Sequence, residues 1–467
     1  MSSNLECFLN PKSIAIIGAS ATPGAVGYTF ISNLIDLNFP GSIFPVHPRL
    51  EEVREVKVYP SVESIPEPVD LAMMALQPSR VSDVVKECGR KGIKAIIVAA
   101  PGFSDVGEEG RKLERKIVEV AREYGIRIVG PNTQGLINID GSSVVLSIPL
   151  RTKLRGGKGV SFICQTGFFY WDWISRSPHV GLSKAIDLGN VCDVNHAETL
   201  EYLGDDTETK VVALHIEGIQ NGQQFMKIAE KVTKKKPVVA LKAGRTEKGA
   251  KAIASHTGAL VGNDAVYDAV FRQVGIVRAL DTNEMVDFAR AFACLSSLPV
   301  GNRIAVVTFS GAGGSLAADA CDEFGLELAK LSDSTKQKMR KIFPPWGSVG
   351  NPIDVLQVVK TDDMKAAYAA ALEALSSDPN VDAVLAIVMM GELVIEFDAL
   401  DVLLEYANNT SRKPTVVCPL RFDGFDRAHQ LDLHGFATFP TVRRAVKALA
   451  VTHARHEYLC SIQDDAD

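Results

Sequence analysis

Short runs of β-branched and aliphatic residues alternate with longer stretches of helical periodicity along this chain. A strand that is apolar on both faces must be covered by helices on both sides, so the alternation predicts parallel sheets with crossover helices. The predicted strands form three series: 13–18, 43–46, 71–76, 95–99 and 126–129; then 160–164, 184–188, 211–216 and 238–242; then 304–309, 383–389 and 415–418. The predicted fold class is α/β.

Each series predicts one domain. The first predicts a Rossmann-like domain over residues 1–130. The second and third open alike, with a strand, a turn of small residues and a helix. Residues 131–298 and 299–467 are therefore interpreted as two flavodoxin-like parallel-sheet domains.

Composition excludes several classes of protein. The formal net charge of -6 argues against nucleic-acid binding. No apolar stretch approaches the about 20 residues that cross a bilayer, and the first residues lack the pattern of a signal peptide. The eight cysteines form no C-x-x-C pair, so no metal site or disulfide framework is expected. We expect a cytoplasmic protein without a membrane or nucleic-acid partner.

The first predicted strand runs into a glycine-rich turn, GASATPGAVG, which begins at Gly18. Glycines let the backbone approach a ligand, and N–H groups at the start of the next helix attract phosphate. The turn is not the G-x-G-x-x-G pattern of dinucleotide enzymes, and Arg49 follows the second strand where those enzymes place an acidic residue. A nucleotide phosphate is favoured over an NAD-dependent dehydrogenase; glycines that only permit helix packing are the structural alternative.

Two further turns precede predicted helices, one in each flavodoxin-like domain. Their N–H groups have no partner within the helix and can hold a phosphoryl group. The candidate phosphate-binding residues are Gln165, Thr166, Gly167, Gly311, Ala312, Gly313 and Gly314. Such turns are common in doubly wound folds, but their recurrence in two sister domains favours a phosphate role.

The segment KAGRTEKGAKAIASHTGALVG, which begins at Lys242, contains a single histidine, His256. Helical periodicity resumes only at 264–274, so a long loop of small residues is predicted, and such loops are usually functional. An imidazole is a competent nucleophile near neutral pH. Glu217 follows the strand 211–216, where its carboxylate could orient His256 and stabilise a cationic phosphoimidazole. An exposed histidine without a role and a solvated glutamate are the alternatives.

Taken together, these features resemble the α subunit of ADP-forming acetyl-CoA synthetases, within the succinyl-CoA synthetase superfamily. The resemblance covers nearly the whole chain. Its motifs are NPKS at 10–13 followed by GASATPGAVG, GPN at 130–132 with Gly135, LGNVCDV at 188–194, HIEGI at 215–219, the histidine segment and GNPID at 350–354.

The resemblance implies a reversible reaction in which acyl-CoA, phosphate and ADP give the free acid, CoA and ATP. An acyl phosphate forms first and passes its phosphoryl group to His256, beside Glu217. The histidine loop then delivers it to ADP. No ATP-grasp pattern occurs in the chain, so the resemblance implies a partner ATP-grasp β subunit that holds the nucleotide with Mg, in an α2β2 assembly.

The resemblance also distributes the ligands of the site. The CoA-binding residues it implies are Gly18, Ser20, Thr22, Gly24, Arg49, Pro78 and Asn132, and those of the acyl pocket are Phe168 and Asn190.

The chain departs from the family pattern at three places. Val191-Cys192 stands where the family has Lys-Ala, Arg49 stands where it often has Lys, and the third place is the segment 164–171. The family has Ser-Gln-Ser-Gly followed by small residues, whereas this chain has CQTGFFYW at 164–171. The aromatic run either packs a helix onto its sheet or reshapes the acyl pocket for an acid other than acetate. A second hypothesis for the whole chain is a CoA-binding regulatory protein without catalysis, which would not need His256.

Overall fold

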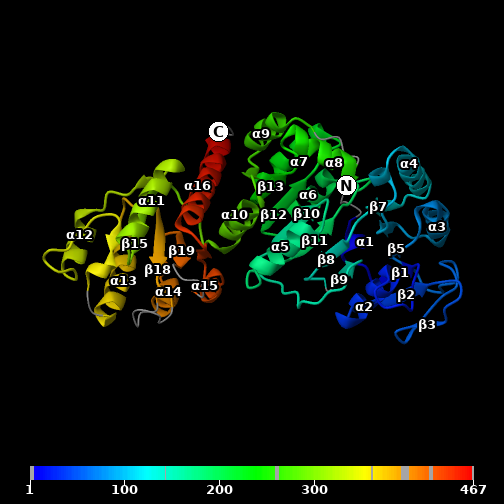
Figure 1. Ribbon diagram of the computed structural model, residues 1–467, viewed down its shortest axis with the longest axis horizontal. Coiled ribbons are helices and arrows are strands. Elements are labelled where there is room, and N and C mark those ends of the chain that lie inside the picture. Colours follow the sequence, from blue (N-terminus) through cyan, green and yellow to red (C-terminus); the bar gives the residue numbers. More distant parts are fainter. Residues whose placement is uncertain are drawn as a thin grey trace. The chain divides into compact units, whose positions relative to one another are not determined.

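The computed structural model describes residues 5–141, 143–257, 262–358, 361–390, 399–419 and 424–464, except the side chains of 254–257, 361–363, 424–426 and 464. The chain divides into two compact units, residues 1–282 and 283–467. Each unit is built from parallel sheets with helices on both faces (Figure 1). The predicted α/β class is confirmed.

The first sheet of unit 1 has the order β2-β1-β5-β6-β7, and all its strands are parallel. The strands are β1 (Ser13–Ile17), β2 (Ser42–Val46), β5 (Leu71–Met74), β6 (Ala95–Val98) and β7 (Arg127–Val129). The other elements are α1 (Glu6–Leu9), α2 (Val26–Asp36), α3 (Pro78–Lys91), α4 (Glu108–Glu123), η1 (Ser104–Val106) and the hairpin of β3 (Glu52–Val53) and β4 (Val56–Lys57). Every residue of β1, β5 and β6 is buried, as a strand covered on both faces requires.

The second sheet of unit 1 has the order β14-β13-β12-β10-β11-β8-β9. The strands are β8 (Gly135–Asn138), β9 (Ser143–Leu146), β10 (Val160–Cys164), β11 (Lys184–Asp187), β12 (Val211–Ile216), β13 (Val238–Lys242) and β14 (Val277–Ala279). The helices are α5 (Phe168–Arg176), α6 (His196–Asp205), α7 (Gly222–Thr233), α8 (Glu247–Thr257) and α9 (Asp264–Gln273). Strands β8 and β9, which the periodicity did not predict, extend the five parallel strands by an antiparallel edge.

The two sheets of unit 1 share one hydrophobic core cluster. The side chain of Asn33, on α2 of the first sheet, donates hydrogen bonds to the carbonyl oxygens of Leu146 (3.0 Å) and Ile148 (2.8 Å), beside β9 of the second sheet. Arg127 at the start of β7 pairs with Asp193 and Glu198. These buried and half-buried contacts hold the two sheets of unit 1 against each other.

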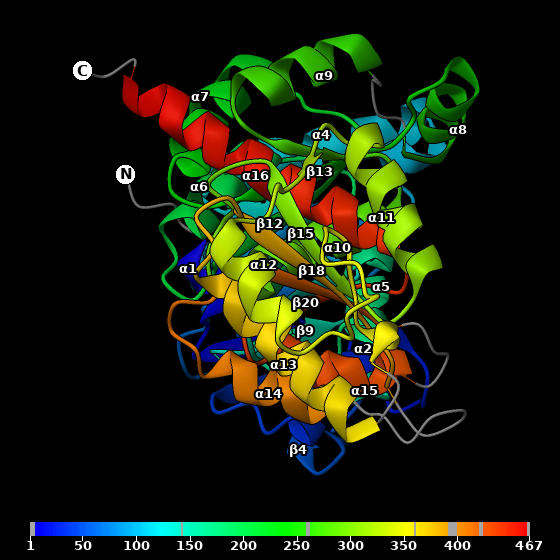
Figure 2. The ribbon, with the colours of Figure 1, turned by 90° about the vertical axis from the view of Figure 1, so that its left-hand side faces the viewer.

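Unit 2 has one parallel sheet of order β16-β15-β18-β19-β20, with β17 also beside β15. The strands are β15 (Arg303–Thr308), β16 (Glu327–Leu328), β17 (Ile353–Asp354), β18 (Ala383–Val388), β19 (Thr415–Pro419) and β20 (Ala437–Thr438). The helical elements are α10 (Thr282–Cys294), which begins at the last residue of unit 1, α11 (Gly311–Glu323), α12 (Asp333–Arg340), η2 (Val355–Gln357), α13 (Thr361–Ser376), α14 (Leu400–Ala407), α15 (Gly424–Asp432) and α16 (Val442–Asp464). Helices α11 and α16 lie together on one face of the sheet, and α13 and α14 on the other (Figure 2).

The parallel strands of the two sheets of unit 1, and those of unit 2 apart from β17, follow the same order: second, first, third, fourth, fifth. In such sheets the connections leave in opposite directions between the first and third strands, which opens a crevice at their carboxyl ends. The three crevices lie between β1 and β5, between β10 and β12, and between β15 and β18.

The loop predicted between Lys242 and Asp264 is wrong, because helix α8 occupies 247–257. The hydroxyl oxygen of Thr246 accepts a hydrogen bond from the N–H of Gly249 (3.1 Å), as an N-terminal cap does. Glu247 in the first turn favours the helix dipole, and the alanines that follow have high helix propensity. His256 lies in the last turn of α8, but its side chain is outside the described residues.

Candidate functional site

The crevice between β10 and β12 joins two residues that the sequence placed in the site. Gln165 directly follows β10, and Glu217 directly follows β12. The side-chain oxygen of Gln165 accepts hydrogen bonds from the N–H of Glu217 (2.8 Å) and of Gly218 (3.4 Å). Both side chains are buried. Gln165 therefore fixes the position of Glu217, and its carboxamide oxygen is engaged by the protein itself.

Helix α5 begins at this crevice. Gly167 stands at its N-cap position, and no side chain caps its N-terminus in the described part of the chain. The N–H groups of the first turn are thus directed at the crevice with the positive end of the helix dipole, which suits an anion. Thr166, half-buried in the same turn, can add its hydroxyl.

Gln134, which the sequence analysis did not select, packs against the same turn. A Cβ on Gly167 would lie 2.0 Å from the Gln134 Oε1, so a larger residue there would displace the Gln134 side chain. The same oxygen accepts hydrogen bonds from the Tyr170 hydroxyl and the Trp171 indole N–H, each at 3.0 Å. The aromatic run on α5 therefore anchors Gln134 beside the anion-binding turn.

A second residue that was not predicted, Asp187, ends β11 and ties two loops together. Its carboxylate accepts hydrogen bonds from the N–H of Gln134 (2.7 Å) and of Gly189 (3.2 Å). Burial raises the pKa of Asp187 to about 7, against the lowering effect of these N–H groups, and the charge of Glu217 adds to the rise. The pKa of Asp187 therefore lies close to neutral pH.

The loops held by Asp187 bring Asn132 and Asn190 together. The Asn132 amide donates to the Asn190 Oδ1 (3.4 Å), and the Asn190 N–H donates to a carbonyl oxygen in the loop before Asn132 (2.9 Å). The amide of Asn190 donates further to Asp105 (3.1 Å) and Glu114 (3.2 Å) of the first sheet. Asn132, predicted to bind CoA, and Asn190, predicted for the acyl pocket, are thus neighbours.

Helix α8 packs against η1, the short helix that contains Asp105. The helix that carries His256 therefore lies near the loops just described. The Glu217–His256 contact predicted from the sequence falls on a side chain outside the described residues.

The other predicted CoA-binding residues gather at the carboxyl edge of the first sheet. A Cβ on Gly18, which has a φ of +89°, would lie 2.4 Å from the carbonyl oxygen of Ala75, so the turn requires glycine. The Ser20 hydroxyl oxygen accepts a hydrogen bond from the Thr22 N–H (3.1 Å). The remaining residues of this edge are Gly24 before α2, exposed Arg49 after β2 and Pro78 at the first position of α3.

The predicted phosphate residues Gly311, Ala312, Gly313 and Gly314 form the first turn of α11, at the crevice of unit 2. Here, in contrast to α5, a side chain caps the helix: the Ser310 hydroxyl oxygen accepts a hydrogen bond from the Gly313 N–H (3.3 Å). Thr308 fixes Ser310 by hydrogen bonds to its N–H and carbonyl (3.0 Å each).

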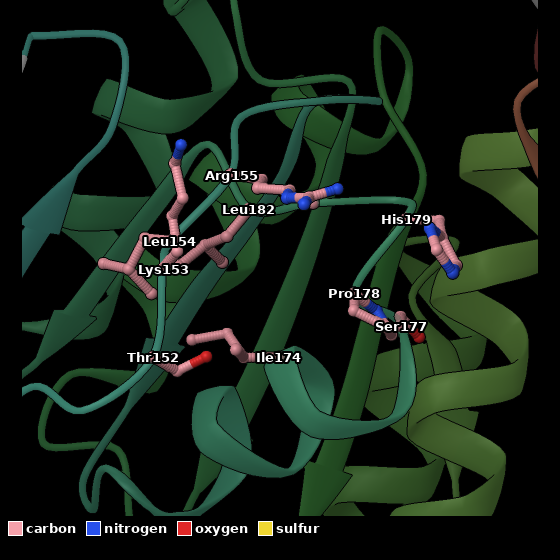
Figure 3. Close-up of a pocket in the computed structure, with 10 residues that line it drawn as sticks. Thr152, Lys153, Leu154, Arg155, Ile174, Ser177, Pro178, His179 and Leu182 are labelled. Atoms are coloured by element: carbon pink, nitrogen blue, oxygen red, sulfur yellow. The ribbon is translucent and has the colours of Figure 1, made fainter.

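The aromatic run of α5 contains both buried and exposed side chains. Tyr170 is fully buried, as core packing requires, whereas Phe168 is 57% exposed beside the anion-binding turn. A separate cavity of about 270 Å³ lies at the other end of α5, lined by Lys153, Arg155 and His179 among others (Figure 3). None of the predicted site residues lines it.

No helix in the described ranges is long and apolar enough to cross a membrane.

Three family models match consecutive parts of the chain: a CoA binding domain over residues 12–138, a succinyl-CoA ligase like flavodoxin domain over 157–292, and a ligase-CoA domain over 304–452.

Several full-length proteins are similar. The α subunit of acetate–CoA ligase [ADP-forming] II from Pyrococcus furiosus is 42% identical over 82% of this chain and 82% of its own. The α subunit of ligase I from the same organism is 36% identical over 96% of this chain and 97% of its own. The dinucleotide forming acetyl-coenzyme A synthetase 1 of Ca. Korarchaeum cryptofilum, solved with phosphate and ADP, has a TM-score of 0.87 at 30% identity, over 98% of both chains.

Other relatives are named for different acids. A 4-hydroxybutyrate–CoA ligase [ADP-forming] from Nitrosopumilus maritimus is 36% identical over 74% of this chain and 50% of its own. A trans-feruloyl-CoA synthase from an unknown prokaryotic organism is 30% identical over 96% of this chain and 64% of its own.

Proposed function

The chain belongs to the family of ADP-forming acetate–CoA ligase α subunits, and on that basis we propose that it forms an acyl phosphate from acyl-CoA and relays the phosphoryl group through His256. An oxygen of phosphate attacks the thioester carbonyl, the C–S bond breaks, and the CoA thiolate takes up a proton. The imidazole of His256 then attacks phosphorus and releases the carboxylate. Attack by the terminal phosphate oxygen of ADP completes ATP and regenerates the imidazole.

The observation that carries this proposal is the crevice between β10 and β12. There the N-terminus of α5, which no side chain among the described residues caps, lies beside the buried Glu217, whose backbone N–H donates to the Gln165 side chain. The N–H groups of α5 can bind phosphate and stabilise the charge that develops on it during attack. Glu217 can balance the positive charge of a phosphoimidazole in a buried setting where water cannot.

We propose that residues 1–130 bind CoA, with its phosphates at the N-termini of α2 and α3, because no side chain among the described residues caps either helix. Residues 131–298 would hold the acyl and phosphoryl groups, and 299–467 would supply the second anion-binding turn on α11. The nucleotide, with Mg, would bind to an ATP-grasp β subunit in an α2β2 assembly, since related chains are named as α subunits. The acid is proposed separately below, because relatives are named for several acids.

A half-reaction separates the roles of the crevice and the histidine. Arsenate replaces phosphate as the attacking oxyanion, and the acyl arsenate hydrolyses without phosphoryl transfer. With the partner subunit present and ADP absent, we expect arsenate to drive loss of thioester absorbance in both the wild type and His256→Ala. ATP formation from acyl-CoA, phosphate and ADP should be lost in the variant alone.

Three results would contradict parts of this proposal. Loss of the arsenate reaction in a folded His256→Ala chain would make the histidine a structural or acylation residue. ATP formation that persists in this variant would rule out the relay. CoA binding without turnover in either assay would favour the alternative, a regulatory CoA-binding protein.

A further inference from the structure

The aromatic residues at the start of α5 form a wall beside the anion-binding turn. Phe168 is the first residue of the helix and directly follows Gly167, yet 57% of it is exposed. Large apolar side chains that are left exposed often mark a surface that binds a ligand or a partner. A phosphate or an acetate methyl group is too small to cover a phenyl ring.

The exposed ring of Phe168 is held in place rather than free to fold away. It meets Phe169 edge-on, with ring centroids 5.3 Å apart and an interplanar angle of 86°. Phe169 stacks in turn on His215, with centroids 3.9 Å apart. His215 lies on β12, two residues before Glu217, and is 2% exposed. The row of rings therefore connects the exposed phenyl to the sheet core.

The His215 ring behaves as an apolar surface. Burial, aided by His196 and Lys242, lowers its pKa to about 3, so the imidazole is neutral at physiological pH. Its Nδ1 has no hydrogen-bond partner among the residues that the structure describes. A neutral ring can stack on Phe169 without the desolvation cost of a charge.

The polar groups of the neighbouring aromatic residues are already used. The Tyr170 hydroxyl and the Trp171 indole N–H both donate to the Gln134 Oε1, so they do not present a donor to an acyl group. Trp171 lies one helical turn after Phe168, on the same side of α5, and is half-buried. The side of α5 that carries Phe168 and Trp171 therefore presents aromatic ring surface next to the turn proposed to bind an anion.

From this arrangement, and resting on the proposed function, we infer that the preferred acid carries an aromatic group that packs on Phe168 and Trp171 while its carboxyl carbon lies at the α5 N-terminus. Edge-to-face and offset-stacked contacts with such a group use the ring surface that acetate leaves exposed. Phe168 is then a specificity-determining residue, and removing its ring should lower kcat/KM for aromatic acids by about 10- to 100-fold.

The test uses the chain assembled with its partner subunit and compares acetate, isobutyrate, phenylacetate and cinnamate under identical conditions. We expect the wild type to have a higher kcat/KM for the two aromatic acids than for the two aliphatic ones. Phe168→Ala should reduce or reverse this preference, and urea unfolding checks that the variant is folded. Phe168→Tyr, which retains the ring, should restore the preference. Trp346→Ala, a change at an exposed aromatic residue of unit 2, is the matched control and should leave the ratio unchanged.

Each other outcome overturns the inference in a distinguishable way. A wild type that prefers acetate, or equal losses for all four acids in Phe168→Ala, removes the aromatic class and leaves the proposed function intact. Preference for isobutyrate would make the wall a branched-chain pocket. Failure with every acid would refute the proposed function and the inference together.

Discussion

Asp187 offers a quantitative test of the geometry of the crevice. Its carboxylate is 1% exposed and joins the loops of Gln134 and Gly189 by hydrogen bonds from their N–H groups. Asp187→Asn keeps the shape of the side chain but removes its charge. The variant therefore isolates how the free energy of unfolding depends on ionising this one group.

The sign and size follow from its pKa. Burial raises the pKa of Asp187 from 3.8 to about 7 in the folded protein. Between these values the folded chain holds a proton that the unfolded chain has lost, so the contribution of Asp187 to stability falls as pH rises. At about 1.36 kcal/mol per pKa unit, the wild type should lose about 2.5 kcal/mol relative to the variant between pH 5 and pH 8.

Tryptophan fluorescence during urea unfolding can measure this difference. The chain contains three tryptophans, Trp171, Trp173 and Trp346. In a Trp346→Phe background the signal comes only from α5, which adjoins Asp187. The free energy of unfolding would be determined at pH 5, 6, 7 and 8 in this background, with and without the Asp187→Asn substitution, so that all other titrating groups are shared.

Two results would contradict a raised pKa of Asp187 in the folded protein. Parallel stability curves would mean that the pKa of Asp187 is the same in the folded and unfolded chains. A wild type that gains stability relative to the variant as pH rises would mean a lowered pKa. In that case the two N–H donors outweigh burial and Asp187 is ionised throughout.

Three further substitutions test the turns. Gln165→Leu removes the acceptor of the Glu217 N–H and should destabilise unit 1 by about 1–3 kcal/mol, measured by urea unfolding. The ATP-forming reaction should also become slower. Unchanged stability would mean that water replaces the carboxamide. Gly167→Ala places a Cβ 2.0 Å from the Gln134 Oε1 and should raise KM for phosphate at least several-fold, whereas an unaltered KM would dissociate the turn from phosphate. Gly18→Ala, where φ is +89°, should weaken CoA binding in calorimetry without changing phosphate affinity, and equal weakening of both would indicate a general folding defect.

The sequence predicted most strands of the three parallel sheets because fully buried strands leave uninterrupted apolar runs, such as 13–17 and 383–388. It did not predict β14, β16, β17 and β20, which have only two or three residues each. It did not predict the β8–β9 hairpin, whose two strands have four residues each and carry Asn138 and Ser143 within the pattern. Nor did it predict α8. The small residues of 247–257 indicated a loop, but alanine combines small size with high helix propensity, and the Thr246 cap was the available signal.

Gln165 and Glu217 lie directly after β10 and β12, as the sequence predicted, because parallel strands end at one edge of a sheet, while their roles stay predictions. Gln134 and Asp187 were missed, since they act through contacts between segments about 50 residues apart in the chain. Their only local signals were a polar residue after GPNT and an aspartate at the end of an apolar strand. Such signals indicate a contact only when the order of the strands shows which segments lie side by side.

His256 is proposed to carry the phosphoryl group between the crevice and the nucleotide. The most direct measurement is incubation of the assembled enzyme with ATP labelled in its γ-phosphate, followed by analysis of the label on this chain. We expect acid-labile, alkali-stable label on the peptide that contains His256, its absence in His256→Ala, and its discharge by the acid and CoA together. Label that persists in His256→Ala, or label on another residue that the acid and CoA discharge equally fast, would contradict it.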